Sequence, residues 1–384
     1  MSVYVASDTR PEHRAEADID GLVLLAVRGL GQMFDPQKQL FCFRLKLSDC
    51  GLVKEGISPR YTMISLLGLH QLKTTTLPCP VEVTTVAETL LEETNWITNI
   101  GDLGLLLWLC ALALPEQVEH IYFKLDVKSA LSRYRDALER RSMELSWFLS
   151  GLAHSTLACG REFPGLEELA LSTYRMLKNN QGDKGFFGHL DRAGSVSGLL
   201  RGRIGSFADQ VYPIYALTRF AQAYKMNSNI AREALKMALN CAEAICRVQG
   251  PLGQWWWHYN SAAGAVVGQY PVYSVHQDGM APMALFALSI ASGQDFSEPV
   301  YRGLQWVVGN NELGRDLRDF SANVIWRSIY RPQYKLRLSY ALNLLKPPTK
   351  LRECDDVMIK FECRPYHLGW FLYSFAGHNP SRTH

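Results

Sequence analysis

Long apolar runs recur along the chain at helical rather than strand-like spacing. Six segments open with polar or capping residues and continue as runs of Leu, Ala, Gly and aromatic residues with little charge on any face. A helix that is apolar on all sides must be covered on all sides, so these segments predict buried helices. The six segments begin near Arg60, Asp102, Ser142, Ser206, Ser274 and Pro365.

Amphipathic stretches with one charged face lie between the buried helices, at residues 127–140, 166–178, 230–247 and 298–307. Such stretches are typical of helices that cover a core on one side and face solvent on the other. The alternation predicts an all-α fold, an α/α toroid with about six inner and six outer helices. Strand-like alternation is confined to residues 40–47 and 80–85.

The N-terminal part differs from the rest of the pattern. We expect residues 1–56 to form an extension that packs on the ring and includes a β-hairpin-like segment, and residues 57–384 to form the toroid domain. The segment 328–352 is basic and contains three prolines. It is expected to run over the surface between the fifth and sixth inner helices.

Composition narrows the class of protein. Of the 384 residues, 47% are hydrophobic and 20% are charged, which is typical of a globular chain. The net charge of +3 is spread along the chain, so no nucleic-acid partner is indicated. The start of the chain does not resemble a secretory signal, and the most apolar run, residues 103–114, is shorter than the ~20 residues that cross a bilayer. We therefore expect a cytoplasmic protein without a membrane span, whose oligomeric state the sequence leaves open.

The nine cysteines include no C-x-x-C pair, so free thiols are expected. Cys354, Cys363 and His367 do not have a standard zinc spacing. We predict no metal and no cofactor, although the sequence does not decide whether these three residues bind an ion. Phosphate-binding, dinucleotide and nucleophile-elbow motifs are also missing from the chain.

An internal repeat supports the toroid. Residues 181–187 and 249–255 both follow the pattern Q-x-x-x-G-x-aromatic, 68 residues apart, and each follows a predicted outer helix. Farther along, Asp209 and Pro213 match Asp278 and Pro282 at a distance of 69 residues. Two successive helical hairpins are therefore interpreted as copies of one unit.

These motifs resemble known toroids. The Q-x-x-x-G-x-aromatic turn is similar to the QW repeat of squalene and hopene cyclases and to turns in protein prenyltransferases. The overall plan resembles the six-hairpin glycosidases, such as unsaturated glucuronyl hydrolases, in which paired Asp residues lie near the N-terminal ends of inner helices. The motif-level resemblance covers about residues 166–293 and implies the fold more than the function.

Polar side chains open all six buried helices, so the toroid would gather them around one mouth. Asp209 and Asp278 are the candidate acid/base pair for inverting glycoside hydrolysis, which needs two carboxyl groups ~6.5–9.5 Å apart. Ser206 and Asp209 also have the spacing of a capping box, as do Ser274 and Gln277. His276 and Tyr273 are candidates for proton abstraction in a lyase or epimerase.

Long loops before the fourth and fifth buried helices are rich in groups that bind sugars and anions. Three consecutive Trp residues, 255–257, cannot all face one core, so we expect at least one of them in the mouth. Trp255 is the candidate to seal the outer turn. The predicted substrate-binding residues are Arg201, Arg203, His189, Asp191, Trp256, His258, Tyr259, Tyr270, Gln277, Tyr212, Tyr61 and His367.

The sequence thus favours a carbohydrate-active enzyme that acts on an acidic or phosphorylated glycan or glycoside by general acid/base catalysis. Hydrolase, lyase and epimerase all remain open. One alternative is a terpenoid cyclase of the squalene-cyclase type, although D-x-D-D and D-D-x-x-D are missing. The other is a ligand-binding toroid without catalysis. Polar groups around Asp278 would favour a sugar, and a dry aromatic barrel would favour a prenyl chain.

Overall fold

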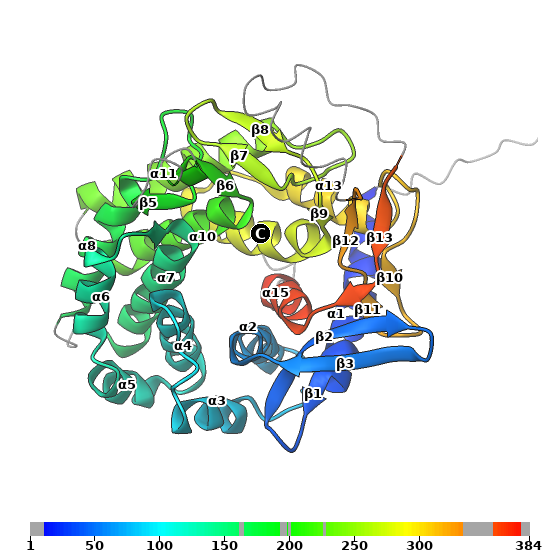
Figure 1. The fold of residues 1–384 in the computed structure, drawn as a ribbon, viewed down its shortest axis with the longest axis horizontal. Coiled ribbons are helices and arrows are strands. Elements are labelled where there is room, and N and C mark those ends of the chain that lie inside the picture. The colour runs from blue at the N-terminus through cyan, green and yellow to red at the C-terminus, as the bar shows by residue number, and fades with distance from the viewer. Residues whose placement is uncertain are drawn as a thin grey trace, which may run out of the picture.

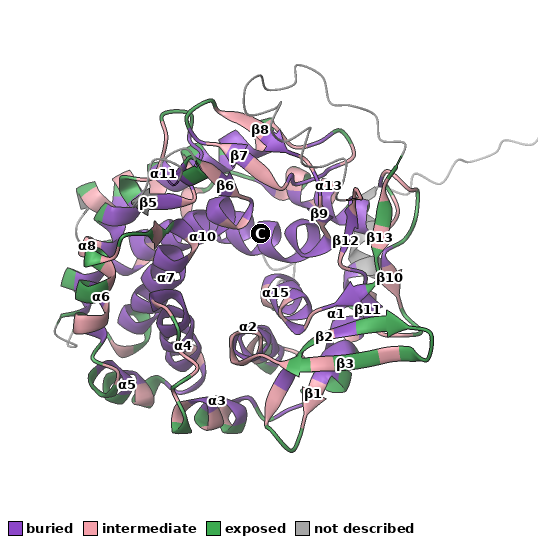
Figure 2. Cartoon of the chain, in the orientation of Figure 1, coloured by how far each residue is buried: buried purple, intermediate pink, exposed green. Residues whose placement is uncertain are grey.

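Six inner helices pack side by side in a closed ring in the computed structural model, which describes residues 11–160, 165–192, 198, 201–225, 228–332 and 356–377 (Figure 1). Each inner helix contacts the next, and the last contacts the first. They are almost entirely buried, as their apolar sequences predicted (Figure 2). In chain order they are α2 (Pro59–His70), α4 (Ile100–Ala113), α7 (Ser142–Cys159), α10 (Ala208–Ala223), α12 (Ala281–Ser292) and α15 (Pro365–Phe375).

Amphipathic helices form a second layer outside this ring, which confirms the α/α toroid. Six of them follow an inner helix along the chain and pack against the ring: α3 (Val83–Glu92), α5 (Val118–Lys124), α6 (Val127–Asp136), α8 (Leu166–Lys178), α11 (Ser228–Arg247) and α13 (Ser297–Val307). The N-terminal helix α1 (Pro11–Met33) packs on α15. The N-terminal segment thus supplies an outer helix as well as the expected hairpin.

Glycines allow two pairs of inner helices to approach closely. A Cβ atom added at Gly104 in α4 would meet the backbone of Phe148 in α7, and one at Gly151 would meet the carbonyl of Gly104. In the same way Gly369 of α15 faces the backbone of Ile64 in α2. The apolar stretches therefore contain glycine where two backbones touch.

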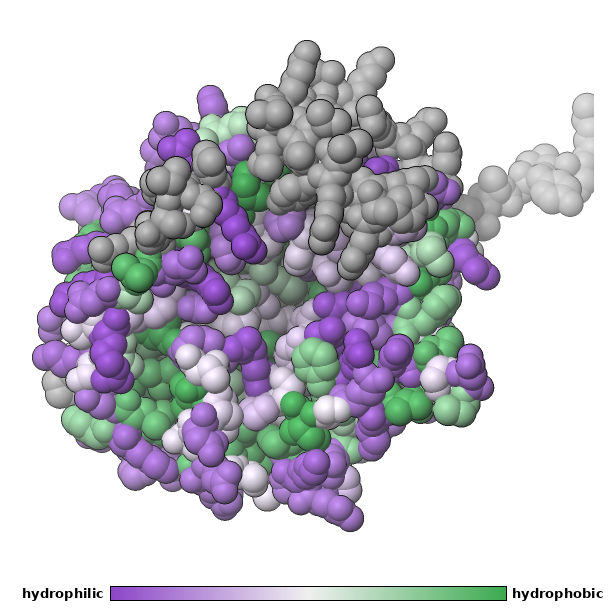
Figure 3. Space-filling model, in the orientation of Figure 1, coloured by the Kyte–Doolittle hydropathy of each residue, from purple (hydrophilic) through white to green (hydrophobic). Residues whose placement is uncertain are grey.

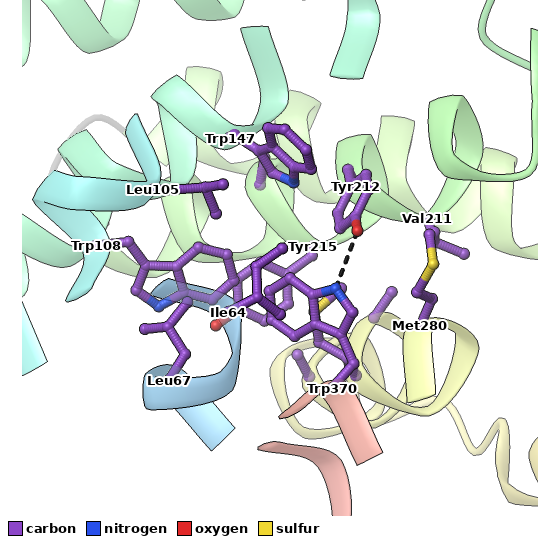
Figure 4. Packing of buried hydrophobic residues seen from close by; sticks show 14 of the residues in the cluster. Ile64, Leu67, Leu105, Trp108, Trp147, Val211, Tyr212, Tyr215, Met280 and Trp370 are labelled. Carbon is purple, nitrogen blue, oxygen red and sulfur yellow. Dashed lines mark hydrogen bonds between the residues drawn. The ribbon is translucent and has the colours of Figure 1, made fainter. Parts of the chain in front are cut away.

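Aromatic side chains fill the middle of the ring (Figure 4). The ring centroid of Trp108 lies 4.8 Å from that of Tyr215 and 5.5 Å from that of Trp370. All three side chains are at most 1% exposed. Trp370 Nε1 donates a hydrogen bond to Tyr212 Oη at 3.0 Å, so the polar edge of the indole is satisfied.

Short strands gather where the inner helices begin. Five of these helices are entered from a strand, so the small sheets stand around the N-terminal ends of the ring. The sheets are β1 (Phe34–Asp35), β2 (Leu40–Ser48), β3 (Gly51–Ile57) and β14 (Glu362–Cys363); β9 (Val272–Tyr273), β12 (Ser328–Tyr330) and β13 (Met358–Lys360); β6 (Ile204–Ser206), β7 (His258–Asn260) and β8 (Ala265–Gly268); β4 (Arg140–Arg141) and β5 (Leu190–Arg192); and β10 (Arg318–Asp319) and β11 (Val324–Ile325).

Two strand predictions have different outcomes. Residues 40–47 do form a strand, β2, which pairs with β3 in a hairpin. The expectation of a strand at residues 80–85 is wrong, because Val83 begins helix α3, whose apolar face packs on the ring. Of the expected surface segment 328–352, residues 328–330 form strand β12, in which Ser328 and Ile329 are buried, and 333–352 lie outside the described residues.

The two turns of the internal repeat are built alike. Gln181 Nε2 donates to the carbonyls of Gly185 and Met237, each at 2.9 Å. Gln249 Nε2 donates to the carbonyls of Gly253 and Pro299, also at 2.9 Å. In both turns the glutamine ties a turn glycine to the next outer helix, which supports the interpretation of two copies of one unit. Within the described residues, no helix is both long and apolar enough to span a membrane.

Candidate functional site

The polar residues at the N-terminal ends of the inner helices meet around one mouth. Arg60 of α2 forms an ion pair of 2.6 Å with Asp102 of α4, and Tyr61 packs 4.6 Å from Tyr366 of α15. On the face drawn in Figure 3, hydrophilic residues border part of the centre of the ring, with apolar residues between them. These contacts bring together residues that open neighbouring helices of the ring, as the predicted topology required.

Asp278 and His367 form a buried pair between two inner helices. Asp278 lies in η3 (His276–Met280), a single turn of π-helix that leads into α12. Its Oδ1 lies 2.7 Å from His367 Nε2, and the side chains are 0% and 4% exposed. Burial raises the pKa of Asp278. Its Oδ2 has no hydrogen-bond partner among the described residues. A π-turn of this kind often marks a functional site.

Asp209 forms a second pair, with His189. Its Oδ2 accepts hydrogen bonds from the backbone N and Oγ of Ser206, both at 2.8 Å, and lies 3.0 Å from His189 Nδ1. The Asp209 backbone N also donates to Ser206 Oγ, so the predicted capping box is confirmed. The hydrogen bond to Asp209 raises the pKa of His189. Asp209 thus caps its helix and orients a histidine with the same carboxylate.

His276 is enclosed by aromatic rings. It stacks on Trp257 at 5.8 Å and meets the edge of Tyr273 at 5.1 Å. Burial lowers the pKa of His276 well below its usual value, and the charge of Arg327 lowers it further. At physiological pH this imidazole is therefore neutral, with an unprotonated nitrogen that can accept a proton, although the lowered pKa makes it a weaker base than a free imidazole.

His258 approaches the mouth from strand β7. Burial lowers its pKa to about 4, although the nearby charge of Asp209 acts in the opposite direction. Its ring also packs 4.8 Å from Trp257. Two of the predicted site histidines are therefore neutral by environment.

Two arginines of the mouth were missed by sequence reasoning. Arg327 and Arg364 both form ion pairs with Glu362, at 3.0 and 3.1 Å. Arg364 Nη1 also donates a hydrogen bond of 2.8 Å to Tyr61 Oη, and Arg327 lies over the ring of Tyr273. No motif marks these arginines, because they lie next to short strands, β12 and β14, that pair with segments far away in the chain.

The other predicted residues are less central. Trp256 is 3% exposed and donates to the carbonyl of Val248, so the tryptophan that lines the mouth is Trp257 and not Trp256. Trp255 is fully buried next to Phe207, consistent with the expected seal of the outer turn. Tyr259 is also fully buried and stacks on Phe186.

The side chain of Gln277 holds two backbone segments together. Its Oε1 accepts from the backbone N of Trp255 at 3.0 Å, and its Nε2 donates to the carbonyl of Tyr273. Gln210, one residue after Asp209, binds the backbone of Phe187 in the same way. The expected capping box of Ser274 and Gln277 is wrong, because the Ser274 hydroxyl donates to the carbonyl of Trp326.

The remaining predicted residues lie at different depths. Tyr212 lies below the mouth against Trp370, and Tyr270 is 5% exposed with its hydroxyl on Glu312. Arg201 and Arg203 are exposed. Asp191 belongs to β5, and its side chain is outside the described residues.

A metal site was left open by the sequence. Cys363 is buried, and burial raises its thiol pKa to about 12. His367 is held by Asp278, and Cys354 lies outside the described residues. Within the described part of the chain, no group of three His, Cys, Asp or Glu residues is arranged to hold a metal ion.

This fold is shared with solved structures of carbohydrate-active enzymes. A sugar epimerase from a ruminal bacterium matches with a TM-score of 0.64 and 10% identity over 93% of this chain and 97% of that one. The cellobiose 2-epimerase of Bacillus thermoamylovorans matches with a TM-score of 0.63 and 10% identity over 94% and 99%. A possible member of glycoside hydrolase family 105 from Salmonella enterica matches with a TM-score of 0.61 and 11% identity over 98% of both chains.

These likenesses establish the fold of this chain, an α/α toroid. No family model and no curated protein sequence matches the chain. At identities of 10% and 11%, the neighbours do not assign a reaction, since one toroid hosts different chemistries.

Proposed function

We propose that the protein is a carbohydrate-active enzyme that acts on an acidic or phosphorylated sugar or glycoside by general acid/base catalysis. Within that class, the geometry best supports removal of a proton from a sugar carbon next to a carbonyl or carboxylate, as in an epimerase or a lyase. The observation that supports this reaction is the neutral, buried imidazole of His276 close to the oriented pair of His367 and Asp278.

In this scheme His276 accepts the proton, and His367 donates one. Asp278 holds Nε2 of His367 and thereby fixes the orientation of that ring. His276 lies in the same π-turn as Asp278, so the two imidazoles belong to one site. Return of a proton to the opposite face of the carbon would give an epimer, and loss of a leaving group would give an unsaturated sugar.

The two carboxylates are less suited to direct hydrolysis. Asp209 and Asp278 are both 0% exposed, and each is hydrogen-bonded to a histidine. Inverting hydrolysis needs one carboxyl group on the leaving oxygen and the other on a water molecule. Both residues are better placed to orient histidines than to contact a glycosidic bond, so hydrolysis is the second candidate.

The packed centre of the ring argues against a terpenoid cyclase. Trp108, Tyr215 and Trp370 occupy the space that a prenyl chain would need, with ring centroids 4.8 and 5.5 Å from Trp108. The mouth above them contains histidines, arginines and carboxylates instead. Such a surface suits a hydroxyl-rich, charged ligand.

The test is solvent isotope exchange. The protein is incubated in deuterium oxide with neutral aldoses, uronates, sugar phosphates and short glycans, and proton NMR follows the carbon next to the carbonyl or carboxylate. We expect deuterium at that carbon together with an epimer or an unsaturated product. His276→Asn should abolish the exchange, and the matched exposed variant His120→Asn should retain it.

Other outcomes distinguish the alternatives. If a reducing sugar is released without deuterium at the neighbouring carbon, the reaction is hydrolysis and not proton abstraction. Binding of a sugar without any conversion would support the non-catalytic toroid. If exchange persists in His276→Asn, His276 is not the group that accepts the proton.

A further inference from the structure

Four basic side chains surround one buried carboxylate beside the mouth. Glu362 is 2% exposed, and its oxygens lie 3.0 Å from Arg44 and Arg327, 3.1 Å from Arg364 and 3.6 Å from Lys360. Burial by itself would raise the pKa of Glu362, but the nearby cations lower it below its usual value. The carboxylate is therefore ionised and balances one of four positive charges.

Two of the four basic side chains, Arg327 and Arg364, carry most of the positive charge that Glu362 does not balance. Arg44 has a second partner, Glu55, at 2.6 Å, and the side chain of Lys360 is 47% exposed to water. Arg327 and Arg364 are 15% and 13% exposed, and Glu362 is the carboxylate within ion-pair distance of both among the described residues. Two mostly desolvated guanidinium groups thus share one negative charge. An added anion would meet less competition from water there than on an open surface.

Aromatic rings fix both guanidinium planes. The Cζ atom of Arg327 lies 4.8 Å from the ring centroid of Tyr273, and that of Arg364 lies 4.3 Å from Phe43. Stacking occupies the faces of a guanidinium and leaves its N–H donors in the ring plane, where Glu362 and Tyr61 already engage some of them and an added oxyanion would share the others. This fork geometry suits an oxyanion.

Tyrosine side chains lie beside the same two arginines. Burial raises the pKa values of Tyr61 and Tyr273, so both phenols remain protonated and can donate hydrogen bonds. Tyr366 packs 4.6 Å from Tyr61, which adds a third phenol to the cluster. The cluster therefore offers phenol donors beside the two cations.

The cluster adjoins the histidines of the mouth through Tyr273, whose ring lies 5.1 Å from that of His276. We propose that the cluster is the subsite that binds the anionic group of the substrate, a carboxylate or a phosphate, and so places the neighbouring carbon beside His276. The inference deepens the proposed function and rests on it. The residues of the subsite are Arg327, Arg364, Tyr61, Tyr273 and Tyr366.

The test compares matched sugars by isothermal titration calorimetry at constant ionic strength. The probes are glucose, glucuronate, glucose 6-phosphate and inorganic phosphate, added to the full chain. We expect one charged sugar to bind at least tenfold more tightly than glucose, and the preferred one tells whether the subsite takes a carboxylate or a phosphate. Arg327→Lys and Arg364→Lys keep the charge but lose the fork, and they should each reduce that preference about tenfold.

Further variants keep the test decisive if an arginine variant unfolds. Tyr366→Phe removes only a hydroxyl and should weaken binding of the charged sugar and not of glucose. Arg175→Gln removes one exposed charge from outer helix α8 and should leave the preference intact. Thermal melting of each variant shows that it is folded.

The outcomes separate this inference from the proposed function. If glucose binds as tightly as both charged sugars, the anion subsite is wrong. The proposal that the protein is a carbohydrate-active enzyme is then not affected. A preference that survives in Arg327→Lys, Arg364→Lys and Tyr366→Phe also overturns the subsite. Failure of every sugar to bind overturns both proposals.

Discussion

The imidazole of His367 and the carboxylate of Asp278 join two inner helices through a contact of 2.7 Å, although 89 residues separate them in the chain. Both side chains are at least nine-tenths buried. A single hydrogen bond therefore links the entry of α12 to the entry of α15. The orientation of His367 depends on a partner that arrives from another hairpin of the ring.

Replacement of this carboxylate should impair catalysis more than stability. Asp278→Asn keeps the shape of the side chain but removes the charge that selects the tautomer of His367. We expect the rate of deuterium exchange to fall roughly 100-fold or more, and the melting temperature to change little, because the amide fills the same volume and can still form a hydrogen bond with His367. Kinetics and thermal melting measured together check this. Asp183→Asn, at an exposed position, is the control, and a wild-type rate in Asp278→Asn would contradict the role of the pair.

Gly369 should tolerate no side chain. A Cβ atom there would lie 2.6 Å from the carbonyl oxygen of Ile64 and would push α15 away from α2. We expect Gly369→Ala to destabilise the protein by about 1–3 kcal/mol in urea unfolding. Gly21→Ala is the matched control in α1, because its Cβ would have ordinary contact with Phe320 at 3.8 Å, and alanine there should be neutral or stabilising by up to ~1 kcal/mol. Equal effects of both changes would refute the close approach.

His258 should make the folded state sensitive to acid. Burial lowers its pKa to about 4 in the folded protein, whereas the unfolded chain takes up the proton near pH 6.5. Above pH 6.5 both states are neutral at this residue, so the residue has no pH effect there. As the pH falls from 6.5 to 4, only the unfolded state gains a proton, and about 3 kcal/mol of stability is lost.

Urea unfolding of the wild type and His258→Gln at several pH values between 7 and 4 measures this loss. The variant should lose less stability over that range. His189 works in the opposite direction, since its pKa is raised by Asp209 and its contribution is lost as the pH rises. The exposed variant His120→Gln should follow the wild type, and parallel curves for His258→Gln and the wild type would rule out a buried neutral His258.

The helical framework was predictable because its signal is local. The six inner helices begin within two residues of the predicted positions, except that the turn at Ser274 continues as η3 into α12. The outer helix α8 has the predicted bounds, 166–178. Continuous apolar sequence and amphipathic periodicity report burial directly, without knowledge of the partner. The short strands of two to four residues around the mouth depend on pairing between distant segments and leave no periodic pattern.

The site was predictable in part for the same reason. Asp278, His276 and His367 lie where helix starts were expected, so the ring topology alone brings them together. Which of Trp256 and Trp257 faces the mouth depends on the register of the extended segment before β7. A shift of one residue would turn each side chain to the opposite side. Arg327 was missed because its partner Glu362 lies 35 residues away, beyond a segment without helical pattern.

The contact between Arg364 and Tyr61 has a consequence for how the protein reaches its native state. These residues are 303 positions apart, and they belong to the segments that open the first and last helices of the ring. Closure of so long a loop comes late, because its entropy cost must be met before the contact stabilises anything. A chain emerging during synthesis can assemble the hairpins between α4 and α12 one after another, yet the mouth takes its final form only after residue 375 has been made.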